Sequence, residues 1–173
     1  MGTTYISSRL SELLTAAQAG LTLARTGNVI PSRVYVAHGP PAVDFCAEGL
    51  LVVYLDNPAI GEDGPSVRKA EAVGPTKRMP ILRMCIELWR CVPNVSDQGI
   101  PPSETDLTTS ANGLANDMWA LDTYLRVNKL TLFPTGLGST VIPNFSDPVP
   151  LPPQGGMSGW RWRVQVPISD IGP

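Results

Sequence analysis

Apolar positions along the chain follow helical and strand-like periods in turn. The first period is helical, because a stripe of apolar residues recurs every three or four positions within residues 8–25. The stripe consists of Leu10, Leu13, Leu14, Ala17 and Leu21. Ser7 or Ser8 can cap this helix, since a serine oxygen accepts a hydrogen bond from a free amide of the first turn. The pair Gly27 and Asn28 is expected to end it.

Three strand-like segments come next. Residues 33–37 form a short β-run, and residues 46–56 contain an apolar run at 50–55 whose two faces we expect to be covered. The clearest strand is 80–91, where the side chains alternate between two faces. One face carries Leu82, Met84, Ile86 and Leu88, and the other carries Arg83, Cys85, Glu87 and Trp89.

A second helix and a last strand complete the pattern. Ser103 and Asp106 have the spacing of a capping box, in which the first side chain satisfies amides of the first helical turn. Helical spacing then continues through Leu107, Ala111, Leu114, Met118, Leu121 and Leu125, and we expect this helix to pack on the sheet. In the strand 160–166, Trp160, Trp162, Val164 and Val166 share one face, and Arg161, Arg163 and Gln165 share the other. Pro167 marks its end.

Two long connections interrupt these elements. Residues 57–79 carry mixed charge and two glycine–proline pairs, and a loop of this length is uncommon in a compact domain unless it is functional or disordered. Residues 133–159 form a proline- and glycine-rich arm that favours extended backbone. The arm either wraps a neighbouring molecule or decorates its own surface.

The order of elements predicts the fold class. Helix, three strands, helix and strand give an α-β-β-β-α-β order, which indicates an α+β fold with a mixed or mainly antiparallel sheet flanked by two helices. The chain has 173 residues, the size of one domain, so we expect a single domain over 1–173. Apolar residues make up 43% of the chain, which is enough for a packed core.

The composition suggests that the chain assembles into a larger object. Only 16% of the residues are charged, against about 25% in ordinary soluble domains, so the chain has less strongly solvated surface than a free monomer. The net charge of −2 does not favour a general nucleic-acid-binding surface, which needs a basic balance. No segment has the length of apolar residues that a membrane-spanning helix requires.

Candidate chemistry is sparse. A Ser-His-Asp site would depend on His38, the one histidine, and no nucleophile or phosphate-binding motif accompanies it. The three cysteines, Cys46, Cys85 and Cys91, lack metal-ligand spacing, and we expect free buried thiols in a reducing cytosol. The sequence therefore predicts no catalytic residue, no metal site and no cofactor, and we expect that the protein is not an enzyme.

Tryptophan and arginine alternate at Trp160, Arg161, Trp162 and Arg163. This pattern has three interpretations: a stacking platform for single-stranded nucleic acid, a core-facing aromatic row with a polar back, or an arginine face that contacts another subunit. The acidic balance of the chain favours the aromatic row over the nucleic-acid platform.

The element order and several local segments resemble the tail terminator and head–tail joining proteins of long-tailed bacteriophages. The similar segments are residues 49–55, residues 87–91, the helix at 103–125 with Trp119, and residues 155–160. The resemblance implies a structural virion protein that forms a ring, a homohexamer in this family, at the head-proximal end of the tail. There it ends polymerisation of the tail tube protein and joins the tail to a head-completion or stopper protein. DNA only passes through the lumen, and no membrane is involved.

The resemblance and the charge pattern together suggest interaction residues. The long loop carries Arg68, Lys69, Lys77 and Arg78, for contact with tube or neck protein. Arg161 and Arg163 are a second candidate pair, for contact between subunits. Two other functions stay open: a head–tail stopper or connector component of the neck, and a small cytosolic enzyme or binding domain with a pocket around His38.

Overall fold

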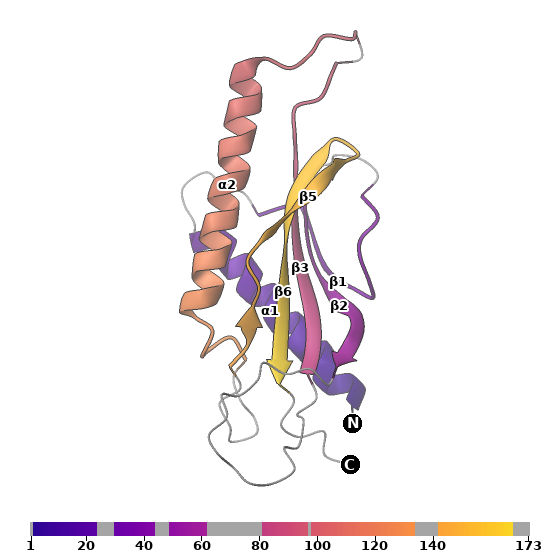
Figure 1. Cartoon of the computed structure of the whole chain (residues 1–173), viewed down its shortest axis with the longest axis vertical. Helices are drawn as coiled ribbons and strands as arrows, with labels where there is room; N and C mark the ends of the chain where they lie inside the picture. The colour runs from indigo at the N-terminus through magenta and orange to yellow at the C-terminus, as the bar shows by residue number, and fades with distance from the viewer. Residues whose placement is uncertain are drawn as a thin grey trace.

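Two helices and a six-stranded sheet make up the part of the molecule that the structure describes (Figure 1). The structure is a computed structural model that describes residues 2–23, 30–43, 49–61, 81–96, 98–133 and 142–167. The helices are α1 (Gly2–Leu23) and α2 (Glu104–Val127). The strands are β1 (Arg33–Ala37), β2 (Leu50–Gly61), β3 (Ile81–Cys91), β4 (Asn144–Phe145), β5 (Val149–Gln154) and β6 (Met157–Pro167).

The sheet is mixed, with the strand order β1-β2-β3-β6-β4, and β5 also pairs with β6. The pair β1 and β2 is parallel, and the other pairs are antiparallel. The predicted α+β class with a mixed sheet and two helices is therefore confirmed.

Both helices contribute to one core on a single face of the sheet. This helix-side core contains the apolar faces that the sequence predicts for the strands 80–91 and 160–166. From the helices it takes Leu10, Leu13, Ala17, Leu21, Leu121 and Leu125, and from the strands Leu51, Val53, Leu82, Met84, Ile86, Leu88, Trp162, Val164 and Val166. The apolar side chains that recur every second residue in the strands and about every 3.6 residues in the helices thus pack together in one layer.

The opposite face of the sheet, the second face, carries a smaller cluster. Its buried members are Leu50, Val52, Tyr54, Cys85, Trp89, Leu151 and Met157. Because β2 contributes fully buried residues to both clusters, the expectation that both faces of the run at 50–55 are covered is confirmed.

The helix α1 begins earlier than the sequence predicts. It runs from Gly2, so Ser7 and Ser8 lie inside the helix and do not cap it. The Ser8 hydroxyl instead donates a hydrogen bond to Glu12, one turn further on, at 3.1 Å. A serine can serve either as a cap or as a partner within the helix, which is why the local pattern misplaced the start.

Strand β2 is longer than predicted. It continues to Gly61 and so includes residues 57–61, which the sequence assigned to the long loop. The extension pairs with the start of β3, with Ile60 opposite Leu82 after a register shift that begins at Leu55. The pairing partner is distant in sequence, so local composition does not indicate this extension. The rest of the predicted loop, residues 62–79, lies outside the described residues.

The described part of the proline-rich arm packs on its own chain. Residues 134–141 lie outside the described residues, but from 144 onward the arm supplies β4 and β5, which both pair with β6. The turn between β5 and β6 is Gly155–Gly156, where both residues have positive φ, as a tight hairpin turn requires. Three prolines lie in β5, which is consistent with an edge strand because proline has no amide donor.

The capping box at the start of α2 is confirmed, but the packing of the helix is only partly as predicted. The Ser103 hydroxyl accepts a hydrogen bond from the Asp106 amide at 3.1 Å. Leu121 and Leu125 are buried, whereas Leu107 is 46% exposed, because the first half of α2 extends beyond the sheet (Figure 1). The buried half contacts α1, where Gly20 lies against Leu121 and Tyr124.

The cysteines differ from the prediction. Cys85 is free and buried, as expected. Cys91 is disulfide-bonded, so the expectation of a free thiol is wrong for this residue. Spacing along the sequence does not reveal which residues the fold brings within reach of the end of β3. Cys46 lies outside the described residues.

A glycine substitution in β6 tests the packing between β3 and β6, and a second one in α2 is its control. A Cβ at Gly159 would overlap the backbone carbonyl oxygen of Leu88, so Gly159→Ala should lower the free energy of unfolding by about 1–3 kcal/mol. Gly113 in α2 has no heavy atom near its Cβ position, and Gly113→Ala should raise stability by about 0.5–1 kcal/mol. Urea unfolding of both variants measures this, and equal stabilities would contradict the described contact.

Candidate interaction surfaces

The predicted pair Arg161 and Arg163 lies on the second face of the sheet. As the alternation predicts, their neighbours Trp162 and Val164 enter the helix-side core instead. The register of β6 against β3 places Arg161 opposite Glu87 and Arg163 opposite Cys85. The two arginines therefore share a face, but they differ in what they contact.

Arg161 is held inside the chain by a buried carboxylate. Glu87 is 1% exposed and accepts hydrogen bonds from the Tyr54 hydroxyl at 2.6 Å and the Trp89 indole at 2.9 Å. Arg161 donates to the same carboxylate through Nε at 2.7 Å, and its Nη2 atom lies 2.6 Å from Oε1. A buried charge is tolerated where it is paired and hydrogen-bonded in this way. We call these four residues the Glu87 network.

Burial controls the ionisation of the groups around Glu87. It raises the pKa of Tyr54, and the hydrogen bond to Glu87 raises it further, so the phenol stays a donor. Burial opposes the charge of Arg161, but hydrogen bonding and attraction to Glu87 outweigh it, and the pKa of Arg161 is raised. Burial and then the charge of Asp56 raise the pKa of Cys85 to about 11. Tyr54, Cys85 and Arg161 thus keep their protons at neutral pH, and none is prepared to act as a base or nucleophile.

Arg163 is the more accessible arginine. Its side chain is 61% exposed and lies 3.3 Å from Asp56 of β2, measured from Nε to Oδ2. Arg83 of β3 lies diagonally across from it, because Arg83 is opposite Gln165 and Arg163 is opposite Cys85. Arg83, Arg161 and Arg163 form a basic row on the second face. Within the described chain, the Nε atom of Arg83 is buried without a hydrogen-bond partner.

The end of the molecule where β3 leads into α2 carries exposed apolar and acidic side chains, in contrast to the basic row. Residues 92–96 and 98–103 form a loop that leads into the projecting half of α2 (Figure 1). Val95 and Ile100 are each 59% exposed there, and Leu107 is also exposed. Glu104 and Asp106 are the charged residues of the first helical turn. We call this surface the tip.

The four predicted loop residues cannot be placed on either surface. Arg68, Lys69, Lys77 and Arg78 all lie outside the described residues. Their role in contact with another protein stays a prediction.

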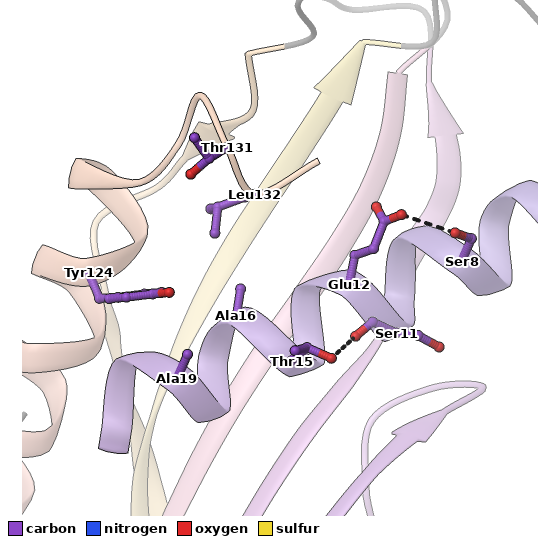
Figure 2. A pocket seen from close by; sticks show the side chains of 9 residues that line it. All are labelled: Ser8, Ser11, Glu12, Thr15, Ala16, Ala19, Tyr124, Thr131 and Leu132. Carbon is purple, nitrogen blue, oxygen red and sulfur yellow. Dashed lines mark hydrogen bonds between the residues drawn. The ribbon is translucent and has the colours of Figure 1, made fainter. Parts of the chain in front are cut away.

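A groove lies between α1 and the turn that follows α2, with a volume of about 430 Å³ (Figure 2). Its lining is rich in hydroxyl groups: Ser8, Ser11, Glu12, Thr15, Ala16, Ala19, Tyr124, Thr131 and Leu132. Glu12 already accepts hydrogen bonds from Ser8 and Arg9, and the Thr15 hydroxyl donates to the Ser11 carbonyl. His38 is exposed and does not line this groove.

Two further observations concern ligands and membranes. Among the residues that the structure describes, no three His, Cys, Asp or Glu side chains gather as a metal site would require. Within the same ranges, neither helix is long and apolar enough to cross a membrane.

Sequence reasoning missed two features of these surfaces. The first is the burial of Glu87, which the alternation in β3 assigned to a polar face. One signal in the sequence was the apolar run at 50–55, which indicates a strand covered on both faces. Because this strand pairs with β3, the cover extends over Glu87 as well. The second is the exposure of Trp119, which is 70% accessible on α2 and which helical spacing alone does not reveal.

Comparisons with protein-family models, with curated proteins and with solved structures gave no match to this chain.

Removing the carboxylate tests the Glu87 network. Glu87→Ala leaves the hydroxyl of Tyr54, the indole of Trp89 and the charge of Arg161 without their shared partner, and should cost about 3 kcal/mol of unfolding free energy. Asp147→Asn is the matched control, because Asp147 pairs with Arg126 at 2.9 Å but is 95% exposed. That variant should unfold like the original protein. Equal losses in the two variants would contradict the assigned burial.

The Cys85 thiol should resist alkylation. Because it is buried and its pKa is raised to about 11, iodoacetamide at about pH 8 should leave it unlabelled in the folded protein, since the thiolate is the reactive form. The same treatment in denaturant should label it fully. Peptide mass spectrometry measures both, and rapid labelling of the folded chain would contradict the result.

Proposed function

We propose that this protein is a tail terminator of a long-tailed bacteriophage: a structural virion protein, without enzymatic activity, that forms a ring at the head-proximal end of the tail. In this role it binds the last ring of tail tube protein, stops further polymerisation and presents its other side to a head-completion or stopper protein. Assembly takes place in the host cytoplasm, and DNA passes through the lumen.

The observation that carries the proposal is the fold itself. The resemblance implies an α-β-β-β-α-β order, and the chain has that order, with two helices on one face of a mixed sheet. The additional strands β4 and β5 come from the proline-rich arm, beyond the common order.

The distribution of charge supports a head-to-tail arrangement of subunits. Such a ring needs two different surfaces on each subunit, one complementary to the other. The tip offers exposed apolar side chains with Glu104 and Asp106, and the basic row offers Arg163 with Arg83. The two surfaces have opposite charge and lie on different elements, as such a contact requires.

The buried groups also support a structural role. The carboxylate of Glu87 finds its partners within the chain, and Tyr54 and Arg161 beside it keep their protons at neutral pH. In a subunit whose task is to present rigid surfaces, such a network fixes strands against one another. The net charge of −2 suits a lumen through which DNA must slide without tight binding.

Electron microscopy of the purified protein mixed with tail tube protein tests the proposal. Rings that cap tube ends, and tubes of limited length, are the expected result. A protein that leaves tube growth unchanged but binds the head-completion protein would replace the terminator role with that of a stopper. A protein that binds neither would overturn the proposal.

Charge reversal at Arg163 tests the basic row. Arg163→Glu should reduce ring formation and tube capping by about tenfold or more, because it places like charge opposite the acidic surface of the neighbour. Arg163→Lys is the matched control that retains the charge, and it should assemble. Thermal unfolding checks that both variants are folded, and equal assembly by folded Arg163→Glu would remove Arg163 from the contact. The paired reversals Lys77→Glu and Arg78→Glu test the loop prediction in the same assay.

A further inference from the structure

Nearly every charged side chain that the structure describes is paired within the chain. Apart from Glu104 and Asp106, each described carboxylate belongs to an ion pair with an arginine, and these carboxylates are Glu12, Asp56, Glu87, Asp117, Asp122 and Asp147. Among the described bases, Arg83 and Lys129 are those whose side chains have neither an ion pair nor a hydrogen bond. The charges that remain for another molecule therefore lie at the tip, in the basic row and in the turn after α2.

The free carboxylate at the tip is that of Glu104. Asp106 accepts a hydrogen bond from the Ser103 hydroxyl at 2.7 Å, whereas the Glu104 side chain has no ion pair and no hydrogen bond within the described residues. Glu104 is exposed in the first turn of α2. It can therefore pair with a cation of another molecule without first giving up a partner of its own.

Arg83 is the counterpart of Glu104 in the basic row. It is half-buried in β3, an inner strand of the sheet, and its Nε atom is buried without a hydrogen-bond partner. Partial removal from water without a counter-charge is unfavourable for a guanidinium. A carboxylate that approaches Arg83 therefore gains more than it would at the exposed Lys129, because the attraction between charges is stronger where the dielectric is lower.

Arg83 and Glu104 of one chain are too far apart to meet. Arg83 lies near the start of β3, and the strand covers about 26 Å from there to Cys91, at about 3.3 Å per residue. The loop at the end of β3 then leads further away to Glu104, at the end of the projecting half of α2 (Figure 1). A pair between the two residues can thus form only between two copies, and it uses a different surface of each.

The tip is preorganised for such a contact. The Ser96 amide donates a hydrogen bond to the Ile100 carbonyl at 2.9 Å, and the Ile100 amide donates to the Ser96 hydroxyl at 3.1 Å. This turn holds Val95 and Ile100 at the surface, where each is 59% exposed. A surface that is already ordered loses little conformational entropy on binding, and apolar side chains beside an ion pair exclude water from it.

We propose that Glu104 of one copy forms an ion pair with Arg83 of the next copy, with the tip lying against the second face of the sheet. Arg163 flanks this pair and keeps Asp56 as its partner within the chain. The inference rests on the proposed function, since it names the two charges that join neighbouring subunits head to tail.

Two charge reversals, studied separately and mixed, test the pairing. Arg83→Glu places like charge opposite Glu104, and Glu104→Arg places like charge opposite Arg83, so each variant alone should associate at least tenfold more weakly than the original chain. An equimolar mixture should regain association, because each variant supplies the charge that the other has lost. Sedimentation over a concentration series measures this. A mixture as dissociated as its components, or an original chain that stays monomeric throughout, would overturn the proposal.

The matched control is Lys129→Glu. It changes the net charge of the chain as much as Arg83→Glu does, but at an exposed base outside the basic row, so it should associate like the original chain. An equal loss in both variants would attribute the effect to net charge and overturn the pairing. Thermal unfolding checks the fold of each variant. If Arg83→Glu is unfolded, Glu104→Arg decides alone, since its position is exposed, and unchanged association of that variant would overturn the proposal.

The tube-capping assay separates this inference from the proposed function. Sedimentation of the chain alone involves no tube protein, so the pairing is measured independently of capping. If the mixture of variants associates but leaves tube growth unchanged, only the proposed function is contradicted. If both single variants cap tubes as well as the original chain does, only the pairing of Arg83 with Glu104 is contradicted.

Discussion

The pairing of β3 with β6 is the contact on which the rest of the structure depends. The two strands pair without a register shift from Ile81 opposite Pro167 to Cys91 opposite Met157. The remaining strands attach to one or the other, with β2 and β1 beyond β3, and β4 and β5 on β6. Because β3 is central and covered on both faces, the fully buried carboxylate of Glu87 needs its partners within the chain. Gly159 shows how close the two strands are, since its Cβ position is occupied by backbone of β3.

This constraint explains the Glu87 network. A carboxylate in a central strand cannot reach water, so its partners come from the strands on either side, Tyr54 from β2 and Arg161 from β6. The network ties three strands together and engages Arg161, one of the two arginines in β6 that the sequence offers as contact residues. What is left for another protein is the accessible Arg163 with its neighbour Arg83. Which arginines of the basic row are accessible thus depends both on their positions in the strands and on the pairing of Arg161 with Glu87.

The two helices differ in how much of their length is buried in the core. α1 crosses behind the sheet and is largely used by the core, whereas α2 commits only its second half (Figure 1). Its first half carries the tip, and Trp119 is 70% exposed further along the helix. Exposed apolar side chains therefore gather on α2 and on the loop before it, as Val95, Ile100, Leu107 and Trp119 show.

The sequence by itself determined the elements whose causes are local. The capping box at Ser103, the alternation in β3 and β6, and the sharing of one face by Arg161 and Arg163 follow from residues within a few positions of one another. Tertiary structure decided what depends on distant partners: the extension of β2 to Gly61, the return of the arm onto β6, the disulfide at Cys91 and the burial of Glu87. It also decided that Trp119 stays exposed while Trp162 is buried, since periodicity assigns a residue to a face but only packing determines whether that face is covered.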